Sequence, residues 1–145
     1  MREKSVRFGD FIRKIRLRDE RELRQSDVAK ELGMSLTMYS DIENNRRRPF
    51  HEENMRIFAE LFDITEDEKT RMLDLASYET HEIPLDLEDI LMYNEVGTLA
   101  RVALRESKAG NATEADWKRF IREIEENKER RKRGEDIDKD ENNES

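Results

Sequence analysis

The sequence of 145 residues contains no cysteine, which rules out disulfide bonds, thiolate nucleophiles and thiolate metal ligands. It has only two prolines and five glycines, and clusters of β-branched residues are missing, so helices are favoured over strands. No apolar run approaches the roughly 20 residues of a membrane-spanning helix. The segment after Met1 is charged and lacks the apolar stretch of a signal peptide. We therefore expect a cytoplasmic, all-α protein rather than a secreted scaffold.

Charged residues make up 44% of the chain and hydrophobic residues 34%, whereas a typical globular protein has about 25% and 45–50%. This composition predicts a compact part and a solvated part. The formal net charge is −8, but the two signs are unevenly distributed. Residues 1–62 contain 14 basic and 12 acidic side chains, whereas residues 63–110 contain 5 and 12. Because the placement of charge governs approach to a polyanion, the acidic total does not exclude a nucleic-acid partner.

Apolar residues recur at three- and four-residue spacing along most of the chain, which predicts a series of helices. The first five have apolar faces within residues 8–15, 28–32, 38–42, 55–62 and 72–76. Ser35 is expected to cap the third of these helices, and Thr65 to open the fifth with a capping box. On the third helix, Met38, Tyr39 and Ile42 are expected to face inward.

The C-terminal half is expected to hold two more helices. A long apolar helix is predicted from Asp86 to Ser107, with more apolar positions than one packing face needs. Thr113 is expected to cap a last helix that carries Trp117. Two uses of the apolar surface remain open, a dimer interface and a small internal core closed by the Trp117 helix. The stretch 128–133 is basic and could contact DNA or form a solvated helix end.

The most informative stretch runs from Gln25 to Glu43 and reads QSDVAKELGMSLTMYSDIE. Two short helices flank a glycine turn there, and the spacing of Ala29, Gly33 and Ile42 suits two helices that cross steeply. This pattern resembles the helix-turn-helix of the Cro/C1-type (XRE) transcriptional regulators, and the resemblance extends over about residues 7–64.

The resemblance implies a lambda-repressor-like, five-helix DNA-binding domain, which we place at residues 1–80. A C-terminal helical region for dimerisation or partner binding is predicted over residues 81–133. The remaining residues 134–145, which read GEDIDKDENNES, are expected to form a disordered acidic tail.

The resemblance also implies that a recognition helix from about Ser35 to Glu43 lies in the major groove of double-stranded DNA. The side chains expected to read base edges are Leu36, Thr37, Ser40 and Asp41. None of them is Arg, Lys, Gln or Asn, so affinity is expected to depend more on phosphates and DNA shape. The candidate phosphate contacts are Gln25, Ser35, Asn44, Arg46, Arg47 and Arg48. The alternatives are that the arginines only form a solvated loop and that Gln25 only begins a helix.

The resemblance also implies structural roles for three further residues. Gly33 makes the turn, and the family pairs Glu43 with an arginine of the first helix, for which Arg16 fits best and Arg18 is the alternative. The chain departs from the family pattern in two places. The loop between Arg16 and Gln25 is about two residues longer than the common form, and Asn45 stands where the family usually has glycine.

An enzymatic function has little support, because the two histidines occur without a zinc-protease motif, a glycine-rich phosphate loop or a nucleophile elbow. We expect no catalysis, no metal and no cofactor, and no feature predicts a preformed ligand pocket. The favoured hypothesis is a repressor that binds a palindromic operator as a homodimer. The alternative is an antitoxin-like module whose C-terminal half neutralises a toxin-like partner protein, with DNA binding serving autoregulation.

Overall fold

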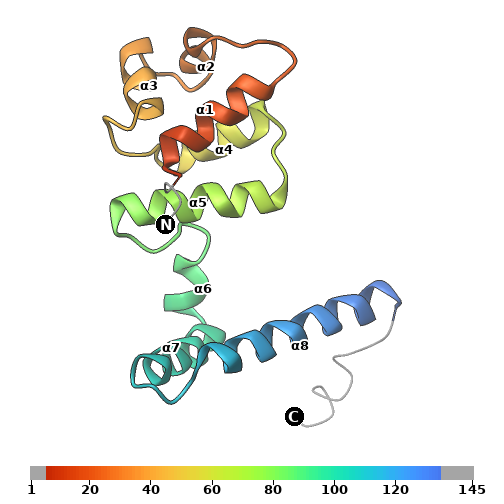
Figure 1. The fold of residues 1–145 in the computed structure, drawn as a ribbon. Helices are drawn as coiled ribbons and strands as arrows, with labels where there is room; N and C mark the ends of the chain where they lie inside the picture. The colour runs from red at the N-terminus through yellow and green to blue at the C-terminus, as the bar shows by residue number, and fades with distance from the viewer. Residues whose placement is uncertain (1–5, 135–145) are drawn as a thin grey trace, which may run out of the picture. The chain divides into compact units, whose positions relative to one another are not determined.

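A computed structural model describes residues 6–134, and all regular secondary structure in this range is helical (Figure 1). The helices are α1 (Phe8–Arg18), α2 (Gln25–Glu31), α3 (Leu36–Glu43), α4 (Glu52–Leu61), α5 (Glu66–Thr80), α6 (Glu88–Tyr93), α7 (Glu95–Lys108) and α8 (Glu114–Lys132). The chain divides into two compact units between Asp89 and Ile90. The predicted acidic tail, apart from Gly134, lies outside the described residues.

The N-terminal unit has the expected five-helix arrangement, in which α1 contacts both α3 and α5. Its core consists of the apolar faces that helical spacing predicts, including Ile12 and Ile15 of α1. Phe50, which follows the basic loop, joins these faces because its ring lies 5.3 Å from that of Phe8 and 5.6 Å from that of Phe58. The loop after α3 is therefore anchored by an aromatic side chain immediately beyond its arginines.

Local signals in the sequence fix where these helices begin and end. The hydroxyl of Ser35 accepts a hydrogen bond from the Met38 amide at 3.1 Å, which confirms the predicted cap of α3. Thr65 and Glu68 form the predicted capping box, with reciprocal hydrogen bonds of 3.0 and 3.1 Å. Gly33 has φ +68° and Asn45 has φ +60°, so both stand in the left-handed region that ends these helices.

The prediction that Met38 faces inward is wrong. Tyr39 and Ile42 are buried, but Met38 keeps 37% of its surface exposed. The inner face of α3 is narrow, and it contains Tyr39, Ile42 and Glu43, whose spacing follows the helical repeat. Met38 lies at the edge of this face and lines a cavity of about 710 Å³ under the loop between α3 and α4.

The single helix predicted from Asp86 to Ser107 is also wrong, because Asn94 divides it into α6 and α7. Asn94 has an extended backbone, and its side chain accepts hydrogen bonds from the amides of Val96 at 2.8 Å and Gly97 at 3.3 Å. Asparagine is among the best N-caps, so it starts a new helix where apolar spacing alone predicts a continuous one. Gly97 is buried and lets α7 approach the carbonyl oxygen of Ile90.

The C-terminal unit has no buried apolar core among its described residues. Its large apolar side chains face solvent, with exposed fractions of 70% for Leu99 and 53% for both Phe120 and Ile121. The indole of Trp117 donates a hydrogen bond to Ser107 at 2.6 Å and so joins α8 to α7, but it is only half-buried. An internal core closed by the Trp117 helix is therefore not formed.

Gly9 generates the first prediction, because it is buried where α1 begins against the end of α3. A Cβ atom there would lie 2.5 Å from the carbonyl oxygen of Glu43, which is backbone and cannot rotate away. We expect Gly9→Ala to lower the free energy of unfolding by about 1–3 kcal/mol in urea titrations. The control Lys14→Ala, at an exposed position of α1, should change it by less than about 0.5 kcal/mol. Equal midpoints for Gly9→Ala and the parent chain would contradict the prediction.

Candidate nucleic-acid interface

Helices α2 and α3 form a helix-turn-helix around Gly33. The turn closes with a hydrogen bond of 3.0 Å from the Met34 amide to the Ala29 carbonyl oxygen, and Ser35 then opens α3. Val28 and Ala29 are buried on α2, whereas the first turn of α3 is exposed. The arrangement buries one side of each helix and leaves the N-terminal end of α3 at the surface.

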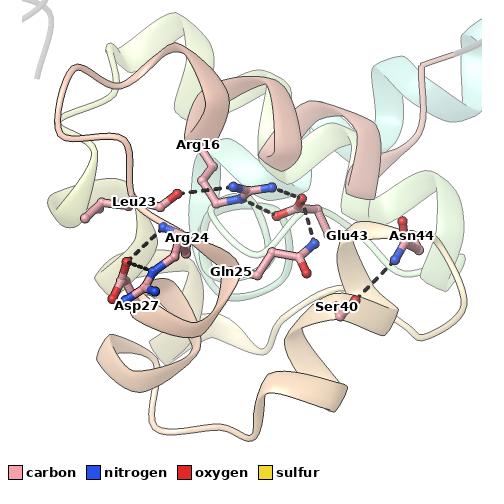
Figure 2. A network of polar contacts seen from close by, with 8 residues as sticks. All are labelled: Arg16, Leu23, Arg24, Gln25, Asp27, Ser40, Glu43 and Asn44. Carbon is pink, nitrogen blue, oxygen red and sulfur yellow. Dashed lines mark hydrogen bonds and ion pairs between the residues drawn. The ribbon is translucent and has the colours of Figure 1, made fainter.

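The last turn of α3 is held by the carboxylate of Glu43 (Figure 2). Arg16 donates two hydrogen bonds to it, from Nε to Oε2 at 2.9 Å and from Nη2 to Oε1 at 2.7 Å. The side-chain amide of Gln25 donates a third to Oε1 at 3.0 Å, and Arg16 also donates to the carbonyl oxygen of Leu23 at 3.1 Å. Of the two arginines considered, Arg16 is therefore the partner of Glu43, because Arg18 pairs with Glu68 instead.

The surroundings of Glu43 and Arg16 keep both side chains charged. Glu43 is 1% exposed, and although burial raises its pKa, the hydrogen bonds from Arg16 and Gln25 hold that pKa below its usual value. The hydrogen bond to Glu43 in turn raises the pKa of Arg16. Burial raises the pKa of Tyr39 as well, so its hydroxyl stays protonated. The end of α3 is consequently fixed by a charged pair that does not change its protonation near neutral pH.

The four expected base-reading residues differ in how accessible they are. Leu36 is 51% exposed and Thr37 is exposed beside it in the first turn of α3. Ser40 and Asp41 are half-buried, and the hydroxyl of Ser40 accepts a hydrogen bond from the amide of Asn44 at 3.2 Å (Figure 2). Leu36 and Thr37 are thus the side chains best presented to a ligand, whereas Ser40 must share its hydroxyl.

The expected phosphate contacts fall into two groups. Gln25 and Ser35 already serve the domain itself, because the first donates its amide to Glu43 and the second caps α3. The second group is exposed and follows α3 directly; it consists of Asn44, whose side chain donates to Ser40, and the loop residues Arg46, Arg47 and Arg48.

Two of the loop arginines lie near carboxylates. Arg47 stands 3.9 Å from Asp41, and Arg48 stands 3.4 Å from Glu82. Arg46 forms no ion pair with any carboxylate among residues 6–134. Both arginines are exposed, and ion pairs of this kind contribute little, so a phosphate can replace the carboxylate at little cost.

Sequence reasoning missed the contact between Asn45 and the start of α1. The side-chain oxygen of Asn45 accepts the Gly9 amide at 2.9 Å, and its nitrogen donates to Asp10 at 3.1 Å. Asn45 therefore does more than replace a glycine at a left-handed position, since it also ties the end of α3 to α1. The available signal was a glycine within an otherwise helical pattern, which indicates close packing.

The Glu43 network generates the second prediction. Arg16→Met removes one partner of a buried pair and leaves the carboxylate uncompensated, so we expect the free energy of unfolding to fall by about 3–5 kcal/mol. The control Arg18→Met removes a half-exposed pair on the same helix and should cost less than about 1 kcal/mol. Urea titration monitored by circular dichroism measures both. Similar losses in the two variants would show that Arg16 is not the anchor.

Comparisons with known proteins agree with this geometry. The family model for the helix-turn-helix matches residues 12–69, which extend from α1 into α5. Comparison with curated proteins finds no match, and comparison with solved structures finds none either. Among the described residues, no cluster of three or more acidic or histidine side chains could hold a metal ion, and no helix is long and apolar enough to cross a membrane. Residues 12–69 therefore form a helix-turn-helix domain, similar to that of the Cro/C1-type (XRE) DNA-binding transcription regulators.

Proposed function

We propose that the protein is a cytoplasmic repressor that binds a palindromic operator as a homodimer. The observation that carries this proposal is the exposed first turn of α3 together with the exposed loop of three arginines that follows the helix, since Met38 of that turn and the three arginines line one cavity. A helix in the major groove needs its N-terminal side chains free and cations within reach of the flanking phosphates. The Glu43 network supports this use because it holds the opposite end of α3 without occupying the exposed turn.

In this proposal, four side chains of α3 contact base edges, each through a different kind of interaction. Leu36 offers apolar contact suited to a thymine methyl group, and Thr37 can donate or accept a hydrogen bond. Asp41 can accept from a cytosine amino group, and Ser40 contributes its hydroxyl when Asn44 releases it. No side chain among these four makes the bidentate contacts of arginine to guanine or asparagine to adenine, so sequence preference arises from several weak contacts and DNA shape.

Phosphate contacts then supply most of the affinity. Arg46 has no ion pair to give up among residues 6–134, and Arg47 and Arg48 exchange the carboxylates of Asp41 and Glu82 for phosphates on binding. Asn44 extends the same surface, and the amides at the starts of α2 and α3, near Gln25 and Ser35, favour an anion. A homodimer places two such surfaces on half-sites about one helical turn apart, which is the basis for a palindromic operator.

The proposal is tested by fluorescence anisotropy on DNA from the protein's own upstream region and on random DNA, at two salt concentrations. A sequence-reading regulator should bind its operator at least about a thousandfold more tightly than random DNA. Weak and equal binding to both would reject sequence-specific regulation by this chain alone.

Arg47 generates the third prediction, which concerns affinity. Arg47→Ala should weaken binding to operator and random DNA by similar factors and lower the salt dependence of log K by about one unit, because one phosphate contact is lost. Anisotropy titrations over a salt series measure this slope. The control Lys69→Ala removes an exposed cation from α5 and should leave the slope unchanged. A loss confined to the operator would argue against a phosphate contact.

Thr37 generates the fourth prediction, which concerns sequence preference. Thr37→Ala should change the ranking of operator variants by about tenfold at the affected base pair, while random DNA binds as before. Competition titrations with single-base operator variants give this ranking. The matched control Thr70→Ala removes the same hydroxyl from an exposed position of α5. Equal losses on operator and random DNA for Thr37→Ala would refute its reading role.

A further inference from the structure

Helix α8 presents an apolar stripe that the described chain does not cover. Phe120 and Ile121 are each 53% exposed and Ile124 is 39% exposed, at the three- and four-residue spacing that places them on one side. Figure 1 draws α8 as one long helix whose later turns extend away from α7. A helix with such a stripe is stabilised chiefly by packing against another element, so α8 requires a partner.

A row of alternating charges runs beside this stripe. Its first four members are Glu114, Lys118, Glu125 and Lys128, whose spacings of four, seven and three residues keep them along one side of α8, and Lys132 follows four residues later at the end of the helix. Within the chain, Lys118 lies 2.9 Å from Glu114, and Lys128 lies 3.3 Å from Glu125. All four side chains are more than half exposed and can turn toward a second helix.

The order of these charges selects the partner. From the N-terminus the first four charges are negative, positive, negative and positive, so a second copy running the opposite way presents the complementary order over the length that the two helices share. With a twofold axis near Ile121, Glu114 faces Lys128 of the other copy, and Lys118 faces its Glu125. In a parallel pair the two rows would lie on opposite sides of the seam, so their charges could not pair with one another. Charges that flank an apolar seam govern the choice and orientation of helix partners.

We propose that α8 pairs antiparallel with α8 of a second copy, with Phe120, Ile121 and Ile124 forming the seam. The pairing deepens the homodimer of the proposed function and depends on that function only for its role at the operator. It is measured without DNA, so failure of the pairing and failure of DNA binding are distinguishable.

The first test disrupts the apolar seam. Ile121→Glu should convert the full chain from dimer to monomer in sedimentation velocity, because it buries a charge at the axis. The matched control Ala115→Glu introduces the same charge on the opposite side of α8 and should leave the dimer intact. Circular dichroism and the unfolding midpoint show whether each variant keeps its folded N-terminal unit. A dimer unaffected by Ile121→Glu would overturn the proposed seam.

The second test changes the charge row. It distinguishes ion pairs between two antiparallel α8 helices from ion pairs within one α8. Lys118→Glu alone sets two acidic side chains against each other twice per dimer and should weaken association by about tenfold. The double variant Lys118→Glu/Glu125→Lys should restore it, because position 118 again faces an opposite charge. Within one helix the double variant instead sets like charges at 114 and 118 and at 125 and 128, so intrahelical pairing predicts a further loss.

The remaining outcomes overturn the proposal. A full chain that stays monomeric at every concentration would show that no second copy covers the stripe. A dimer with a further loss of association in the double variant would reject the antiparallel register. A monomer that dimerises only on operator DNA would assign dimerisation to the N-terminal unit.

Discussion

Glu43 ends α3 with a carboxylate that water scarcely reaches, and three helices meet at this group. A buried carboxylate without partners would cost several kcal/mol, so the fold must bring a cation and a further donor to it. Arg16 comes from α1 and Gln25 from the start of α2. The position of α3 is therefore set from its C-terminal end. The side chains of its N-terminal turn make no contact of this kind and stay exposed for a ligand.

Because α3 is fixed at its C-terminal end, the helix-turn-helix contains some side chains that already bond within the domain and others that remain available to a ligand. Gln25 and Ser35 look like ligand contacts in the sequence, but their side chains complete the hydrogen bonding of the domain. Leu36 and Thr37 make no comparable contact and are exposed. The arginines follow α3 in a loop that Phe50 anchors in the core, and they line one cavity together with Met38 of the exposed turn. In a chain of net charge −8, the acidic side chains elsewhere disfavour nonspecific approach of a polyanion.

The five N-terminal helices were predictable because periodicity, caps and turn residues all agree there. Ser35, Gly33 and Thr65 each act locally, and the core that they delimit follows the helical repeat. Where predictions failed, one signal outweighed another. The cap at Asn94 overrides a continuous apolar pattern. The glycine at position 9 indicates a close contact, but no local pattern identifies Asn45, 36 positions away, as its partner.

The C-terminal unit depends on a different source of stability from the N-terminal one. The helices of the N-terminal unit share a closed core, whereas α8 has ion pairs three and four residues apart and an open apolar stripe. Such ion pairs contribute only about 0.2–0.5 kcal/mol each, which is too little to hold a long helix by itself. If α8 pairs as proposed, its folding and its association are one equilibrium. Its stability would then rise with protein concentration, while that of the N-terminal core would not.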